Sequence, residues 1–324
     1  MSKKMELGLC LFEPRTETGE VSPWALMETC ETAEAMGFDY LALPDRVSRP
    51  VPRFDTLTLM AGIALRTKKI RMQTHIFVLP LRQPIELARR IITVDHLSQG
   101  RFTFVVGLGG EGSSVYLKEY QDVGIAKEER GRRANEMLEA LKILWTQPSA
   151  TFEGKYYRFK DVVFEPKPYQ RPHPPIWVGG ASEGAFRRVV KYADGWAGSV
   201  EHSTVSYGSA GNAIKRLNAM AAEAGRDPQS VHISLCTRVN INKSRDQAVK
   251  EAEDFWAKQR GSIEGGRSFD KKTEVGFYGP PELVIDHLKE LRNFGVQGVI
   301  IHFHSFNIKE QLRRFEQQVM PAMN

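Results

Sequence analysis

Residues 80–110 read PLRQPIELARRIITVDHLSQGRFTFVVGLGG, a helix-forming stretch followed at once by a strand-forming one. Pro84 suits the first turn of a helix, and the apolar spacing after it predicts a helix as far as Leu97. Arg101–Val106 is short, apolar and rich in aromatic and β-branched residues, which is typical of a buried strand. The strand runs into the glycine-rich segment Gly107–Gly110. These residues therefore predict one helix–strand unit of an α/β sheet.

The same alternation extends along the whole 324-residue chain. Helical patterns separate eight strand-like segments, which are Met5–Leu11, Tyr40–Leu43, Ile70–Leu79, Arg101–Val106, Ile176–Val178, Gly195–Ala197, His232–Val239 and Gly298–His302. Eight such units predict a single α/β domain over residues 1–324, a (β/α)8 TIM-type barrel. A doubly wound open sheet is the competing topology. The strand count and the lack of a Gly-x-Gly-x-x-Gly motif after the first strand weigh against it.

Three stretches interrupt the alternation. Residues 151–164 have the pattern of an inserted β-hairpin. Residues 199–212 and 261–277 are polar, rich in glycine and serine, and each follows a predicted strand. Loops that follow barrel strands lie at the C-terminal mouth, so we expect these two segments to be lid loops there.

Composition excludes several classes of partner. The net charge is +6, but basic residues alternate with acidic ones on amphipathic helices, so we expect no nucleic acid. No apolar run approaches the ~18 residues of a membrane span, and the first residues lack a signal-peptide pattern. Cys10, Cys30 and Cys236 have no metal-binding or redox spacing. We therefore expect a cytoplasmic protein that acts on a small molecule.

Ligands of such barrels bind where strands end and loops begin. Gly179, Gly180, Ala181 and Ser182 lead directly from a strand into a helix, so their N–H groups and the positive helix end suit a phosphate. A plain strand-to-helix turn with Ser182 as N-cap explains the same residues, and both interpretations stay open at this point. Gly107, Leu108, Gly109 and Gly110 allow a planar ring to approach the backbone closely.

Further motifs follow one another in order along nearly the whole chain. They are Leu79–Ala88, Asp95–Arg101, Gly107–Gly110, Glu129–Gly131, Pro166–Pro168, Pro174–Gly180, Ala193–Trp196, Tyr278–Glu282 and Val319–Pro321. Together they resemble the bacterial luciferase-like monooxygenase family. The resemblance implies a TIM-type barrel, usually a homodimer, that holds reduced FMN or a deazaflavin coenzyme at its C-terminal mouth. It also implies that Thr74, His75 and Ile76 lie beneath the flavin ring, with a cis peptide bond between His75 and Ile76, and that the phosphate lies on residues 179–182.

One position departs from the family pattern. Many members have Asp-His after the second strand, whereas this chain has Asp45-Arg46. The resemblance places Asp45 at the cofactor. An arginine cannot act as a base near neutral pH, but it can stabilise a negative flavin or an anionic substrate. Arg46 and His75 are therefore the candidate catalytic residues, and a hydrogen-bonded barrel histidine is the alternative interpretation of His75.

Four residues near strand ends are candidates for the substrate pocket: Phe12, Phe54, Trp196 and His302. His302 and His304 alternate onto one face at the end of the last strand, which raises the question of a metal. A metal site would need a third ligand, and no spacing supplies one, so we expect no metal.

Three functions are compatible with these residues. The first is a two-component monooxygenase that uses reduced FMN and dioxygen on a small organic substrate, with the FMN supplied by a separate NAD(P)H:flavin reductase. The second is a deazaflavin-dependent reductase or dehydrogenase that transfers hydride. The third is a non-catalytic flavin-binding protein, which the Arg46 substitution keeps open. No NAD(P)-binding fingerprint is present, in keeping with an external reductase.

Overall fold

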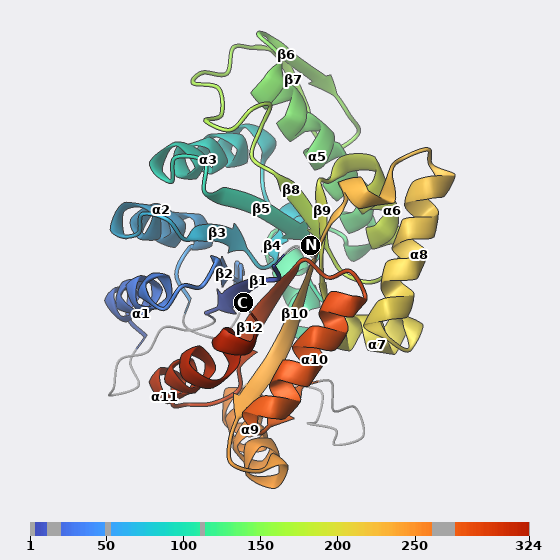
Figure 1. The fold of residues 1–324 in the computed structure, drawn as a ribbon. Helices are drawn as coiled ribbons and strands as arrows, with labels where there is room; N and C mark the ends of the chain where they lie inside the picture. The colour runs from blue at the N-terminus through green and yellow to red at the C-terminus, as the bar shows by residue number, and fades with distance from the viewer. Residues whose placement is uncertain (1–3, 12–20, 49–52, 111–113, 261–275, 324) are drawn as a thin grey trace.

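The computed structural model describes residues 4–11, 21–48, 53–110, 114–260 and 276–323. Within these residues, parallel strands close into an eight-stranded barrel that helices surround (Figure 1). Around the ring the strands are β1 (Glu6–Cys10), β2 (Tyr40–Leu43), β3 (Arg71–Thr74), β5 (Phe102–Gly107), β8 (Ile176–Gly179), β9 (Gly195–Ser199), β10 (His232–Ile241) and β12 (Gly298–Phe303). β12 pairs with β1 and closes the ring, with Leu7 beside Val299. The predicted α/β fold, a (β/α)8 TIM-type barrel, is confirmed.

The helices that cover the barrel are α1 (Pro23–Ala35), α2 (Thr56–Arg66), α3 (Pro84–Leu97), α5 (Arg130–Thr146), α6 (Glu183–Tyr192), α8 (Ala210–Glu223), α9 (Arg245–Arg260), α10 (Pro281–Asn293) and α11 (Ile308–Arg314). Side-chain caps fix the start of several of them. Ser22, Asp55 and Ser182 each accept a bond from the N–H three residues further on, which satisfies a donor that the helix itself leaves unpaired. α3 has the bounds that the sequence predicts.

Successive side chains of each strand point to opposite faces of the sheet. They form two apolar layers, one inside the barrel and one between the barrel and the helices. On β5, Phe102 and Phe104 point outward into the main core between strands and helices. Val105 points inward, where it packs with Trp177 and Ala197. Every second residue of a strand therefore faces the barrel axis, and the last inward residue of each strand stands at the C-terminal mouth.

The third predicted strand, Ile70–Leu79, is divided in the structure. β3 ends at Thr74, and β4 (Phe77–Val78) pairs with β5 after a break of two residues. The peptide bond between those two residues, His75 and Ile76, is cis, as the resemblance implied. His75 and Ile76 therefore lie between two strand segments at the rim of the barrel.

Other elements differ from the prediction. Residues 199–212 are not a loop, because α7 (Val200–Tyr207) and the start of α8 occupy them. Ser199 caps α7 by accepting a bond from the N–H of His202, a local preference that outweighs the glycine and serine content. α4 (Ser114–Asp122) and β11 (Phe277–Gly279), which pairs with β10, are additional elements. Of the second expected lid, 261–277, all but the last two residues lie outside the described residues.

The hairpin expected at residues 151–164 consists of β6 (Ala150–Glu153) and β7 (Arg158–Val162), which pair antiparallel. It projects beside α5 at the periphery of the barrel (Figure 1). None of the described helices combines the length and apolar character needed to cross a membrane.

Candidate active site

The C-terminal ends of the strands surround an open mouth. Deeper inward-facing side chains such as Ala42, Val105 and Ile300 are fully buried. At the strand ends, His75, Cys236 and His302 keep partial exposure to solvent. Because a close-packed interior would bury all of these side chains, the region between the strand ends has room for a ligand.

Ile76 occupies one side of this mouth, between two glycines. A Cβ atom on Gly107 would come within 2.7 Å of Ile76 Cγ2, and a Cβ atom on Gly179 within 2.2 Å of Ile76 Cδ1. Gly109 and Gly180 have φ angles of 76° and 97°, a left-handed backbone that favours glycine. At the ends of β5 and β8, the two glycines therefore leave room for the side chain of Ile76, which packs directly on both backbones and forms an apolar wall of the mouth.

The helix α6 begins directly beyond this surface. Its cap is Ser182, whose Oγ accepts a bond from Ala185 N at 3.2 Å. The Nε1 of Trp196 donates to Gly180 O at 2.7 Å and holds the turn in place. The first N–H groups of a helix lack intrahelical partners and carry partial positive charge. The interpretation of Ser182 as an N-cap is confirmed. The same turn also presents N–H groups and partial positive charge, as an anion site would.

Arginine side chains concentrate positive charge beside this helix end. Arg188 on α6 donates to Gly184 O at 3.1 Å and to Asn135 Oδ1 at 2.8 Å, two uncharged partners. Its Nη2 lies 2.6 Å from where a Cβ atom on Gly131 would stand. Burial lowers the pKa of Arg188, and the charge of Arg130 lowers it further. An anion at this place would offset the repulsion between the two guanidinium groups.

α4 closes the other side of the glycine-rich loop. The hydroxyl of Tyr120 donates to Leu108 O at 2.6 Å. A Cβ atom on Gly110 would come within 2.4 Å of the Tyr116 ring. The two tyrosines thus hold Leu108 and Gly110 beside α4, a conformation that the sequence pattern alone did not define.

Two uncharged histidines stand at the mouth. Burial lowers the pKa of His75 to about 4, with a smaller contribution from His202. Burial also lowers the pKa of His302 to about 3, and Arg238 and His75 add to the effect. Both rings are therefore neutral at pH 7. Among the described residues, the buried Nδ1 of His75 has no hydrogen-bond partner, so a ligand can bond to it.

Comparison with known proteins identifies the family. The model of the family described as luciferase-like monooxygenase matches residues 5–298. The chain belongs to this family. An FMNH(2)-dependent dimethylsulfone monooxygenase of Pseudomonas putida is 25% identical over 321 residues, which cover 90% of this chain and 86% of that protein. The predicted family and enzyme class, a luciferase-like oxidoreductase, are confirmed.

Solved structures agree on the fold. Monooxygenase RslO1 from Streptomyces bottropensis superposes with a TM-score of 0.81 at 20% identity, over 99% of this chain and 100% of that one. An F420-dependent secondary alcohol dehydrogenase in complex with an F420-acetone adduct superposes with a TM-score of 0.80 at 19% identity, over 99% of both chains. The fold of this luciferase-like family member is therefore shared with enzymes whose names refer to different reactions.

The structure gives Asp45 partners within the protein. Its buried carboxylate accepts two bonds from Arg82 Nη2, at 2.9 and 3.0 Å, and one from Val78 N at 3.1 Å. Burial raises the pKa of Asp45 to about 6, although Arg82 opposes the shift. These bonds show that Asp45 ties the end of β2 to β4 and to the segment after it, and its contact with the cofactor stays a prediction.

Arg46 lies beside α4. Its guanidinium is 4.4 Å from the centre of the Tyr116 ring, and Nη1 is 3.9 Å from Glu119 Oε2. Glu119 is buried and also accepts a bond from Val47 N at 2.9 Å. The charge of Arg46 is thus balanced by a carboxylate that the sequence analysis did not identify, and its catalytic role stays a prediction.

Three further candidates are placed differently from the prediction. Thr74 is buried and its Oγ1 exchanges bonds with O and N of Val105, so its hydroxyl joins β3 to β5 and does not reach a cofactor. Trp196 is buried between β9 and α6, with its ring 5.3 Å from Phe186, so its prediction as a substrate contact is wrong. Phe54 is 41% exposed, and Phe12 lies outside the described residues.

The sequence analysis did not identify Arg238, and it named His304 without the partner that the structure gives it. Arg238 at the end of β10 forms an ion pair with Glu201 on α7. Its position two residues after Cys236 and four after Ser234, all facing inward, is the signal that could have identified it. His304 Nδ1 lies 3.1 Å from the hydroxyl of Tyr278. Within the described residues, no group of three or more histidine, cysteine, aspartate or glutamate side chains could hold a metal ion.

Proposed function

We propose that this chain is the oxygenase of a two-component system, which uses reduced FMN and dioxygen to oxygenate a small organic substrate. A separate NAD(P)H:flavin reductase would supply the reduced FMN. One observation carries the proposal: Ile76, packed on the glycine backbone of β5 and β8, forms an apolar wall of the mouth beside the positively charged start of α6. Flavin mononucleotide consists of a flat ring and a phosphate. The ring fits against the apolar wall, and the phosphate fits at the positively charged helix start.

The residues fit such a cofactor. The phosphate would lie on Gly179–Ser182, where the α6 N-terminus, Arg130 and Arg188 concentrate positive charge. The ring would lie against Ile76 and the Gly107–Gly110 loop, where Cβ atoms on the first and last glycines would collide with Ile76 and Tyr116. His75 offers a buried nitrogen without a described partner.

The bound reduced flavin would supply the electrons that activate dioxygen. The protein's own residues would bind and orient the flavin and the substrate, and they would exclude water from the site. Ile76 would contact the ring, and Tyr120 holds the segment beside it by donating to Leu108 O. His75 and His302 are neutral, so each ring carries one donor and one acceptor nitrogen, and the Nδ1 of His75 would bond to the cofactor or the substrate.

The second candidate function is hydride transfer with a deazaflavin coenzyme. The observation in its favour is the TM-score of 0.80 to the F420-dependent secondary alcohol dehydrogenase. The relative named as FMNH(2)-dependent, matched over 90% of this chain, supports FMN. A non-catalytic flavin-binding protein stays the third hypothesis. We further expect a homodimer in the cytoplasm, as the resemblance and the composition predict.

The phosphate part of the proposal is tested with FMN and riboflavin, which share the ring and differ in the phosphate. We expect Arg188→Met to weaken FMN about tenfold to a hundredfold, the cost of one lost charge-assisted bond, and to leave riboflavin unchanged. Affinities would be measured by calorimetric titration of the purified protein. Arg313→Met, which removes an exposed arginine on α11, is the matched control and should change neither affinity.

Two results would contradict this assignment. Equal affinity of the wild-type protein for FMN and riboflavin would show that no phosphate site exists. Equal weakening of both ligands by Arg188→Met would show that Arg188 supports the fold of the pocket and does not bind phosphate.

A further inference from the structure

Aromatic side chains gather where β10, β11, β12 and α9 meet. The centre of the His304 ring lies 5.2 Å from Phe255, 5.7 Å from Trp256 and 5.9 Å from Tyr278. The His302 ring packs edge-on against His304 at 4.8 Å. Phe255, Tyr278 and His304 are buried, whereas Trp256 and His302 keep partial exposure. These five residues, the aromatic corner, therefore present Trp256 and His302 at their accessible side.

The two residues at the accessible side of the aromatic corner, Trp256 and His302, carry no charge. The pKa of His302 is lowered to about 3 by burial, so the ring is neutral. Arg238 contacts the corner, with its guanidinium 4.8 Å from the Trp256 ring centre, and it is paired with the carboxylate of Glu201. An anion that entered here would lose its hydration and find the adjoining cation already neutralised.

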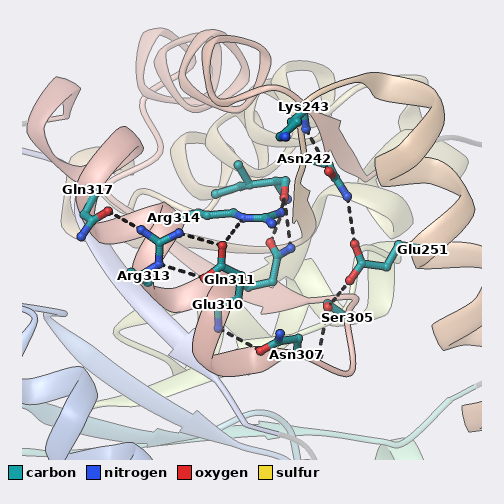
Figure 2. Close-up of polar contacts among 11 residues, drawn as sticks. Asn242, Lys243, Glu251, Ser305, Asn307, Glu310, Gln311, Arg313, Arg314 and Gln317 are labelled. Atoms are coloured by element: carbon teal, nitrogen blue, oxygen red, sulfur yellow. Dashed lines mark hydrogen bonds and ion pairs between the residues drawn. The ribbon is translucent and has the colours of Figure 1, made fainter.

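A polar network outside the barrel holds α9 in place (Figure 2). Glu251 on α9 accepts a bond from Ser305 Oγ at 2.5 Å and another from Asn242 Nδ2 at 3.0 Å. Asn242 follows β10 and Ser305 follows β12, so one carboxylate ties the helix to the ends of two strands. Phe255 is one turn beyond Glu251 on the same helix face, so the network also fixes the aromatic corner.

We propose that the aromatic corner is the substrate side of the mouth, and that it selects an uncharged substrate with a flat aromatic ring, which packs against the partly exposed Trp256 and His302. The inference rests on the proposed function, because a substrate bound here would face the cofactor across His302 and His75. Contact between aromatic rings stabilises such a ligand beyond the burial of its area. Arg53, whose charge lowers the pKa of Cys10 at the end of β1, is a second cation near this end of the barrel and is tested as the alternative counter-ion of an anionic substrate.

The experiment uses two probes that match in shape and differ in charge, methyl phenyl sulfone and benzenesulfonate. Calorimetric titration of the full-length protein is expected to give about tenfold tighter binding of the neutral sulfone, since the anion has no new counter-ion here. Trp256→Ala should weaken the sulfone about threefold to tenfold, and Trp256→Phe should restore most of the affinity. Tyr169→Ala, which removes an exposed aromatic ring elsewhere, should have no effect.

FMN affinity is measured on the same samples, so the two proposals fail separately. Loss of FMN binding with selectivity for the sulfone retained would contradict the proposed function alone. The aromatic corner is overturned if benzenesulfonate binds as tightly as the sulfone, above all if Arg53→Met then abolishes its binding. It is also overturned if no sulfone binding is measurable, or if folded Trp256→Ala binds the sulfone like the wild type.

Discussion

His75 and His302 are two of the few titratable side chains that face the mouth, and both are held neutral by burial. Neutral imidazole can donate and accept at once, which suits a site whose ligand changes charge during a redox reaction. Sequence reasoning identified both residues from their place at strand ends. It did not predict their neutrality, because that depends on burial and on the neighbouring charges of His202 and Arg238.

The neutrality of His302 has a measurable effect on stability. In the unfolded chain a histidine titrates near pH 6.5, whereas the pKa of His302 in the folded protein is about 3. Between these values the unfolded chain holds the extra proton, so the folded state loses stability as pH falls below about 6.5. His302→Gln removes this proton. The slope of the unfolding free energy against pH should therefore fall by about 1.4 kcal/mol per unit between pH 6 and 4.

Urea unfolding of the wild type and His302→Gln at several pH values between 6 and 4 measures both slopes. Asp45, whose pKa is raised to about 6, has the opposite influence on stability, but it is present in both proteins and cancels in the comparison. Parallel curves for the two proteins would contradict the assignment of a neutral, buried His302.

At the scale of helices and strands, local sequence signals predicted where an element such as α3 begins and ends. Contacts between distant segments determined which way its neighbours' side chains point and what they bind. α3 has the predicted bounds because Pro84, an apolar stripe and the turn after Leu97 all favour the same helix. Trp196 was misassigned because the alternation of β9 turns it toward α6, while Ala197 faces inward. Arg188 and Glu119 could not be identified, because their roles arise from helices that meet only in the folded barrel.

Glu251 is the element-scale link between α9 and the strand ends. Glu251→Ala removes the bonds from Ser305 and Asn242, so we expect faster hydrogen exchange of the α9 amides and a loss of about 1–3 kcal/mol in stability. Glu251→Gln keeps an acceptor for Ser305 and should have a smaller effect. Hydrogen exchange read by mass spectrometry, with α3 as internal reference, measures the difference. Equal exchange of α9 in Glu251→Ala and the wild type would contradict this role.

At the scale of the whole molecule, the mouth of the barrel has two dissimilar sides. β5, β8 and α6 contribute glycine backbone, a helix end and Arg188, whereas β10 contributes Arg238, which is paired with Glu201, and β12 and α9 contribute aromatic rings. β9 separates the two groups on one side of the ring, and β1, β2 and β3 separate them on the other. A cofactor with a phosphate fits the first side and an uncharged substrate the second, so a single barrel can bring the two together at His75 and His302.

The central claim is that this mouth binds reduced FMN. Anaerobic titration of the purified protein with reduced FMN, and separately with the reduced deazaflavin coenzyme, tests it most directly. Our account predicts micromolar or tighter binding of reduced FMN, and weaker binding of the deazaflavin. Binding of the deazaflavin alone would assign the chain to hydride transfer, and binding of neither cofactor would contradict the redox function altogether.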